Sequence, residues 1–192
     1  MNAPLTPFPG NLLLVLAPGS GGAIMWNLLA RLACQGSVLV LDGGNRFNLH
    51  AVARALQGQL PRALEGAPER NSARPPGSAL ERALARILLS RAFTCYQMET
   101  LLKDIAPRPV PILVLDLLCT FYDESVSTEE SRRILESCLG HLRRLNRVAP
   151  VAISAQPGPP TGRRQLLEVL QAAADHIWLL EPDATPPPPR LL

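Results

Sequence analysis

Lysine is almost absent from this sequence of 192 residues, because Lys103 is the only one and every other basic side chain except histidine is an arginine. Any chemistry that needs a lysine must therefore use Lys103, which lies far along the chain from the glycine-rich segment near residue 20. Charged residues make up 18% of the chain, against about 25% in an average domain. The net charge of +3 is too small to require a nucleic-acid partner, although it permits one.

Long apolar runs and metal-ligand patterns are also missing. No stretch approaches the ~18 apolar residues of a membrane span, and the first apolar run has no basic residue before it, unlike a secretory signal. The histidines are scattered, and the cysteines form no C-x-x-C pair, which favours buried free thiols over metal ligands or disulfides; they are Cys34, Cys95, Cys119 and Cys138. We therefore expect a cytoplasmic protein with no membrane segment and no metal site.

Apolar runs typical of strands alternate with helix-like segments. Strands are expected at 12–16, 37–42, 87–91, 112–116, 151–155 and 177–180, and helices at 24–33, 49–60, 79–85, 94–105, from 127 onward and at 163–174. Strands that are apolar throughout and separated by helices predict a mostly parallel α/β sheet with helices on both faces. We expect one core domain over 1–183, with a loop insertion at 61–78 and a Pro-rich tail at 184–192.

A glycine-rich turn lies between the first expected strand and the first expected helix, with the sequence Pro18-Gly19-Ser20-Gly21-Gly22-Ala23. In this context backbone N–H groups can cradle a phosphate at the start of a helix. Compared with the phosphate-loop pattern GxxxxGK[ST], Gly22 stands at the lysine position and Ala23 at the Ser/Thr position. The backbone cradle is kept and both side-chain groups are lost, so a plain tight turn is an equally good interpretation of this segment alone.

Two later strands end in polar residues that suit a nucleotide site. One ends at Asp116, as in a Walker B strand whose carboxylate organises Mg²⁺, and another is followed by Gln156, whose amide could sense a γ-phosphate. Asp42 ends a third strand. The carboxyl ends of parallel strands meet at one sheet edge, where ligand crevices form, so we expect these side chains to share that edge.

Together these segments resemble the RecA/RadA recombinase family, in particular its RadA-like branch. Besides the glycine turn, the matching segments are 41–47 (LDGGNRF), 90–97 (SRAFTCYQ), 113–116 (LVLD), 142–145 (LRRL) and 153–156 (ISAQ). The Arg-Ala-Phe segment is the most specific of them, because generic phosphate-loop proteins do not share it. The resemblance covers the chain from the first strand to about Leu180 and implies a RecA-like P-loop NTPase core.

Three departures from the family fall on its chemistry. The resemblance places the family's lysine, its magnesium-binding hydroxyl and its water-orienting glutamate at Gly22, Ala23 and Gly44. Phosphoryl transfer depends on positioning and charge neutralisation, so little of the machinery remains. A hydrogen bond to a charged group is worth ~1.5–3 kcal/mol, and losing the lysine alone weakens nucleotide binding roughly ten- to a hundredfold. We expect a pseudo-ATPase with no catalytic residue, for which weak binding of ATP with Mg²⁺ is the one cofactor interaction left open.

The resemblance also indicates where single-stranded DNA would bind. The two loops that contact DNA in the family correspond to 122–130, which is acidic and opposes phosphate contact, and to 157–164, which ends in Arg163 and Arg164. These arginines are candidates for a modest DNA contact. The alternative is a pair of solvated surface arginines.

Three functional hypotheses follow. The first is a non-catalytic RecA/RadA-like paralogue that assists recombination or repair by binding a recombinase-type or other DNA-repair protein, or single-stranded DNA, with self-association left open. The second is a DNA-dependent ATPase completed by residues from another subunit. The third is a bare scaffold with an unrelated binding role. The acidic first loop favours a protein partner over DNA.

Overall fold

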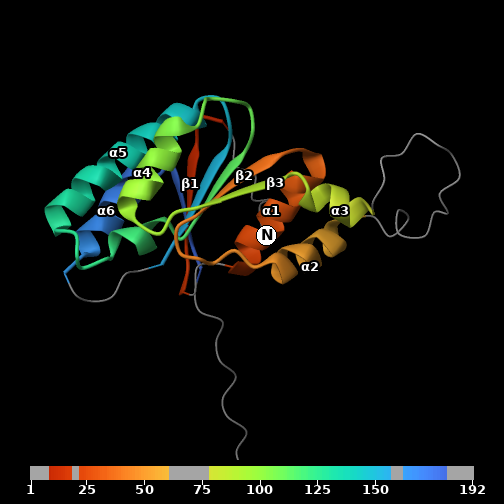
Figure 1. Cartoon of the computed structure of the whole chain (residues 1–192), viewed down its shortest axis with the longest axis horizontal. Coiled ribbons are helices and arrows are strands. Elements are labelled where there is room, and N and C mark those ends of the chain that lie inside the picture. The colour runs from red at the N-terminus through yellow and green to blue at the C-terminus, as the bar shows by residue number, and fades with distance from the viewer. Residues whose placement is uncertain (1–8, 19–21, 61–77, 157–161, 181–192) are drawn as a thin grey trace, which may run out of the picture.

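The computed structural model describes residues 9–18, 22–60, 78–156 and 162–180 (Figure 1). Its elements are β1 (Leu12–Leu16), α1 (Gly22–Gln35), β2 (Val38–Asp42), α2 (Leu49–Gln59), α3 (Ala79–Leu84), β3 (Ile87–Arg91), α4 (Cys95–Asp104), β4 (Ile112–Leu115), the 3-10 helix η3 (Leu117–Phe121), α5 (Thr128–Asn146), β5 (Val151–Ala155), α6 (Arg164–Ala173) and β6 (His176–Leu179). The expected elements are confirmed to within a few residues at their ends. The expected insertion, apart from Ser78, and the Pro-rich tail lie outside the described residues.

The described strands form one six-stranded sheet in the order β3-β2-β4-β5-β1-β6, and all five neighbouring pairs are parallel. The first strand lies inside the sheet. It pairs with β5 from Leu12 opposite Val151, and with β6 from Leu13 opposite His176. Both of its neighbours therefore come from the far end of the described chain. The expected parallel α/β architecture is confirmed.

Helices cover both faces of the sheet, as Figure 1 shows. On one face, alternate strand residues such as Leu14 and Val114 pack with α4, α5 and α6 in one buried cluster. On the other face, residues such as Val15 and Val40 pack with α1, α2 and α3 in a second cluster. The four central strands are buried on both sides, which explains why their sequences are apolar except for Asp42 at the end of β2 and Ser154 in β5. No helix among the described residues has the length and apolar character needed to cross a membrane.

Arginine side chains tie the ends of helices to neighbouring elements. Arg144 of α5 donates through Nη2 to the carbonyl oxygens of Leu102, Lys103 and Ile105 at the end of α4. Arg86, just before β3, donates through Nη1 to the carbonyl oxygens of Ala33 and Cys34 at the end of α1. The last carbonyl groups of a helix have no partner within the helix, and a cation there also interacts favourably with the helix dipole.

The cysteines differ in their surroundings. All four thiols are free, and Cys95 and Cys138 are buried as expected. Burial raises the pKa of the Cys138 thiol from 9.0 to about 12. The expectation of burial is wrong for Cys119, which is exposed in η3, and Cys34 is only partly buried.

Candidate functional site

Two buried aspartates lie at the carboxyl edge of the sheet. Asp42 is the last residue of β2, and Asp116 directly follows β4, the next strand in the sheet. Both are almost completely inaccessible, with 0% and 1% of their surfaces exposed. Burying a carboxylate is costly unless it is paired and hydrogen-bonded, so the partners of these two groups define the chemistry of this edge.

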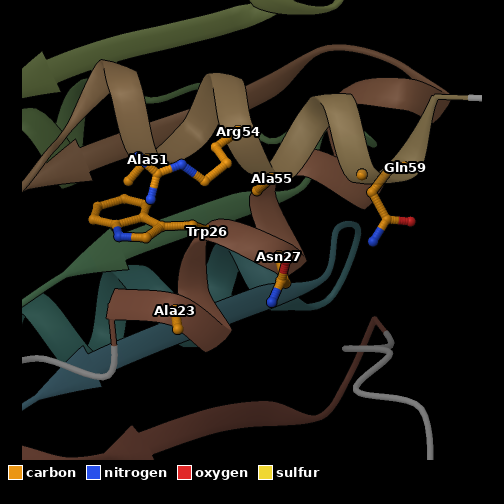
Figure 2. A pocket seen from close by; sticks show the side chains of 8 residues that line it. Ala23, Trp26, Asn27, Ala51, Arg54, Ala55 and Gln59 are labelled. Atoms are coloured by element: carbon orange, nitrogen blue, oxygen red, sulfur yellow. The ribbon is translucent and has the colours of Figure 1, made fainter.

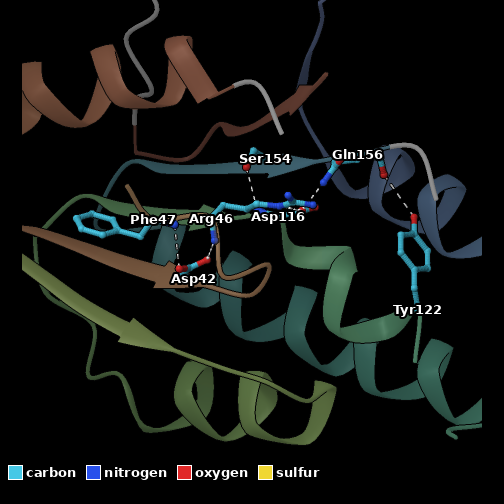
Figure 3. A network of polar contacts seen from close by, with 7 residues as sticks. All are labelled: Asp42, Arg46, Phe47, Asp116, Tyr122, Ser154 and Gln156. Carbon is cyan, nitrogen blue, oxygen red and sulfur yellow. Dashed lines mark hydrogen bonds and ion pairs between the residues drawn. The ribbon is translucent and has the colours of Figure 1, made fainter. Parts of the chain in front are cut away.

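Asp116 is held by side chains from two other segments (Figure 3). Its Oδ2 atom accepts hydrogen bonds from Gln156 Nε2 at 2.6 Å and from Arg46 Nε at 3.0 Å. Its backbone N–H donates to Ser154 Oγ on β5 at 2.9 Å. Asp116 and Gln156, which the sequence places at the same sheet edge, are therefore in direct contact.

Asp42 organises the turn between β2 and α2. Its carboxylate accepts the backbone N–H groups of Arg46 at 2.8 Å and Phe47 at 3.0 Å (Figure 3), and Arg91 Nε at 3.2 Å. Asn45 completes the turn with a positive φ of 53°, which asparagine tolerates better than most residues. These bonds fix the backbone of the turn and so direct the Arg46 side chain towards Asp116.

Sequence reasoning missed the two arginines that neutralise these aspartates. Arg46 forms the ion pair with Asp116, and Arg91 forms the one with Asp42. Both residues lie inside segments that carry the family resemblance, but neither was given a role. A usable signal was present, since aspartates at the ends of two buried strands require counter-ions and the only cations near those strands' ends are arginines.

Gly44 brings the same turn into close contact with Asp116. A Cβ atom built on Gly44 would lie 2.6 Å from both Cβ and Oδ2 of the aspartate, closer than real Cβ atoms approach their neighbours. Gly44 is the position at which the resemblance places the family's water-orienting glutamate. The space that such a side chain would enter is filled by Asp116.

The glycine-rich turn is described only in part, because Gly19, Ser20 and Gly21 lie outside the described residues. Pro18 is exposed after β1, and Ala23 is exposed near the start of α1. A Cβ atom on Gly22, the first residue of α1, would lie 3.1 Å from Nε1 of Trp26. The indole of Trp26 therefore lies next to Gly22, the position at which the resemblance places the family's lysine.

Trp26 also connects α1 to the turn that carries Arg46. Its ring meets the Phe47 ring edge-on, with centroids 6.1 Å apart and an angle of 85° between the planes. This T-shaped arrangement is a favoured geometry for aromatic pairs. Trp26 therefore packs against Phe47, the residue that directly follows Arg46 of the Asp116 ion pair.

A groove of about 460 Å³ lies between α1 and α2 (Figure 2). Its lining consists of small or polar residues and one aromatic residue, namely Ala23, Trp26, Asn27, Ala51, Arg54, Ala55, Gly58 and Gln59. In Figure 2, Arg54 on α2 extends towards Trp26 on α1. Neither Asp116 nor Gln156 lines the groove, although Trp26, which does, contacts Phe47 in the turn after β2.

The two adjacent arginines that were DNA-binding candidates have different environments. Arg163 is only 9% exposed, and its guanidinium donates to the carbonyl oxygens of Phe121 and Val126 and to Ser131 Oγ. Arg164, in contrast, is exposed at the start of α6. The sequence suggested either a DNA contact or a solvated surface arginine, and Arg163 is neither. It is buried and holds the segment before α5 in place. The residues 157–161 of the second loop lie outside the described part.

Comparison with known proteins supports the fold. No protein-family model matches the sequence, and no curated protein is similar to it. Among solved structures, the RadB recombinase aligns with a TM-score of 0.59 and 15% identity over 90% of this chain and 75% of its own. A DnaB-like replicative helicase aligns with a TM-score of 0.54 and 15% identity over 92% of this chain, which spans only 49% of the helicase chain. The chain has the RecA-like P-loop NTPase core fold.

Proposed function

We propose that this chain is a non-catalytic RecA/RadA-like paralogue that assists DNA recombination or repair in the cytoplasm by binding a recombinase-type partner. The observation that carries the non-catalytic role is the contact between Gly44 and Asp116. A glutamate at position 44 could not be accommodated without displacing Asp116, because even its Cβ atom would lie 2.6 Å from the carboxylate. This edge therefore packs as a closed network instead of holding a water-orienting carboxylate.

Exposed apolar side chains support binding to a protein partner. The strand β3 lies at one edge of the sheet, so one side of its backbone has no neighbouring strand among the described residues. Leu88 on this strand is 54% exposed, and Phe93, which follows it, is 69% exposed; Leu89 and Tyr96 are also exposed. An apolar edge strand is a ready site for another protein chain, because it combines free backbone groups with surface that water disfavours.

Direct binding of single-stranded DNA is the weaker form of the proposal. The segment before α5 carries Asp123 and Glu124, both exposed, and like charge opposes phosphate contact. Arg163 is committed to protein carbonyl groups, which leaves Arg164 as the exposed member of the pair. The RadB recombinase, one of the structures that share the fold, suggests the class of partner to test first.

The partner experiment measures binding of the full chain to a RecA- or RadA-type recombinase from the same cells by fluorescence anisotropy. Replacing an apolar anchor of an interface typically costs 1 kcal/mol or more, so Leu88→Ser and Phe93→Ser should each weaken binding about fivefold or more. Leu179→Ser is the matched control, since Leu179 is 75% exposed on β6 at the opposite edge of the sheet. Equal losses for Leu88→Ser and Leu179→Ser would contradict the β3 surface.

A separate experiment tests the non-catalytic role. ATP hydrolysis is measured with Mg²⁺, with and without the recombinase partner and single-stranded DNA. We expect no turnover by the chain alone, and no increase above the partner's own rate that depends on this chain's Asp116. Magnesium-dependent turnover that Asp116→Asn abolishes would replace the proposal with its alternative, an ATPase completed by another subunit.

A further inference from the structure

The charge balance at the carboxyl edge of the sheet is met within the chain. Asp42 and Asp116 contribute two buried negative charges, and Arg91 and Arg46 each supply one guanidinium through Nε. The net charge of each Asp–Arg pair is therefore zero. Among the described residues, no group of three or more His, Cys, Asp or Glu side chains is arranged to hold a metal ion.

The residues around Asp116 do not fit the Mg²⁺ ion that the fold implies at this position. Magnesium requires oxygen ligands in a near-ideal octahedron. Here Asp116 Oδ2 already accepts hydrogen bonds from Arg46 Nε and Gln156 Nε2, so both neighbouring side chains present N–H donors and not oxygen ligands. Gly44 packs against the same carboxylate and closes a further direction of approach.

We infer that Arg46 is the resident cation of this site and holds, as part of the chain, the position at Asp116 that a divalent metal ion takes in a working nucleotide site. This deepens the proposed non-catalytic role and rests on it. The turn 43–47 directs the Arg46 side chain towards Asp116, because Asp42 fixes the backbone of the turn through two hydrogen bonds. The guanidinium neutralises Asp116 permanently, so the fold needs neither metal nor nucleotide at this edge.

The two ion pairs differ in a way that makes the inference testable. Without Arg91, Asp42 would still accept two backbone N–H groups, from Arg46 and Phe47. Among the described residues, the Gln156 amide is the side-chain donor that Asp116 would keep without Arg46. Removing Arg46 should therefore create a buried, poorly compensated carboxylate that attracts a cation, whereas removing Arg91 should not.

The experiment measures thermal unfolding of the full chain with and without millimolar Mn²⁺, in the absence of nucleotide, and counts bound Mn²⁺ by electron paramagnetic resonance. The Arg46 side chain is 44% exposed and Asp116 is buried, so Arg46→Gln removes a charged hydrogen-bond donor from a buried carboxylate and should lower Tm by roughly 6 °C. Mn²⁺ at ten times its dissociation constant should restore about 4 °C of that loss in Arg46→Gln. The wild-type protein and Arg46→Lys both keep a cation at this position, so Mn²⁺ should not change their Tm.

Two variants act as controls. Arg91→Gln tests whether loss of any arginine at this edge creates a metal site, and we expect it to lower Tm without a response to Mn²⁺. Asp116→Asn is introduced into Arg46→Gln to remove the carboxylate, and the double variant should bind no Mn²⁺. Asparagine is chosen because position 116 has a left-handed backbone with φ 51°.

Several outcomes would overturn the inference. One is Mn²⁺ binding by the wild-type protein that Asp116→Asn removes, and another is a folded Arg46→Gln that ignores Mn²⁺. If Arg46→Gln does not fold, the double variant with Asp116→Asn tests the inference instead. Removing the unpaired carboxylate should restore folding, and a double variant that also fails to fold contradicts the role of Arg46. The Mn²⁺ titration contains no nucleotide, so a negative result there contradicts only the role of Arg46. ATP turnover by the chain, measured separately, would contradict the proposed function.

Discussion

Gly44 and Asp116 lie so close together that a single added carbon on the glycine would be 2.6 Å from the carboxylate oxygen of the aspartate. The contact joins the turn after β2 to the residue after β4. The packing therefore requires that position 44 carry no side chain, and a glutamate placed there would have to displace Asp116.

Gly44→Glu tests this contact directly. The added side chain must displace Asp116, so we expect a loss of about 2 kcal/mol or more in the free energy of unfolding and no gain of ATP hydrolysis. Urea denaturation and a phosphate-release assay measure the two effects. Gly58→Ala is the control, because Gly58 lies in α2 with nothing within 4 Å of its added carbon, and it should stabilise the protein by about 0.5–1 kcal/mol. An active Gly44→Glu would contradict the closed network.

Arg163→Ala is expected to be strongly destabilising. It leaves the carbonyl oxygens of Phe121 and Val126 and the hydroxyl of Ser131 without this donor, at a cost of about 3 kcal/mol. Arg164→Ala, on the adjacent exposed residue, should change stability by less than about 0.5 kcal/mol. Chemical denaturation of the two variants measures the difference. Equal effects would mean that the buried arginine does not hold the segment before α5.

Arg144→Ala should loosen the end of α4. The side chain joins α5 to three carbonyl oxygens at that end, and its loss should cost about 1–2 kcal/mol. Hydrogen exchange of the last turn of α4 should also become faster, because local opening no longer breaks the contacts with α5. Arg143→Ala, which alters an exposed neighbour on the same helix, is the control and should leave exchange in α4 unchanged.

Stability should fall at alkaline pH because of Cys138. Burial raises the pKa of its thiol from 9.0 to about 12 in the folded protein, so between these values the unfolded chain loses a proton that the folded chain keeps. The contribution is fully present below pH 9 and is lost as pH rises, by up to about 1.4 kcal/mol per pH unit. Urea denaturation from pH 8 to 11 measures the slope.

Cys138→Ala separates this thiol from the other groups that titrate at alkaline pH. The variant should be less stable at pH 8, because a small cavity remains, but its stability should fall less steeply above pH 9. Parallel pH profiles for the two proteins would show that another group causes the loss.

The arrangement of the sheet could be predicted from the sequence because it depends on apolar runs and on their spacing along the chain. The run 112–115, and the run 151–155 with Ser154 as its one polar residue, are buried on both faces, and their separation by helices favours parallel pairing. The edge strands are the exception. β3 begins with the apolar residues 87–89, yet Leu88 and Leu89 are exposed, because the position of a strand in the sheet depends on distant segments.

The site was predictable only for its acidic and amide members. Asp42 ends one buried strand, and Asp116 and Gln156 directly follow two others, so strand direction alone brings them to one edge. Their arginine partners, Arg46 and Arg91, could not be predicted, because the pairing depends on side-chain directions that the periodicity of the sequence does not indicate. The same reason explains Arg163, whose burial depends on carbonyl groups more than thirty residues away in sequence. Its neighbour Arg164 looks the same in sequence and faces solvent.

The position of β1 has a consequence for how the protein is made. Leu12 and Leu13 acquire their strand partners only from residues 151 and 176, so the apolar segment 12–16 leaves the ribosome long before either neighbour exists. Closing so distant a contact is slow compared with local helix formation. A nascent chain that stops before residue 151 therefore lacks both strand neighbours of β1 and cannot complete the middle of its own sheet.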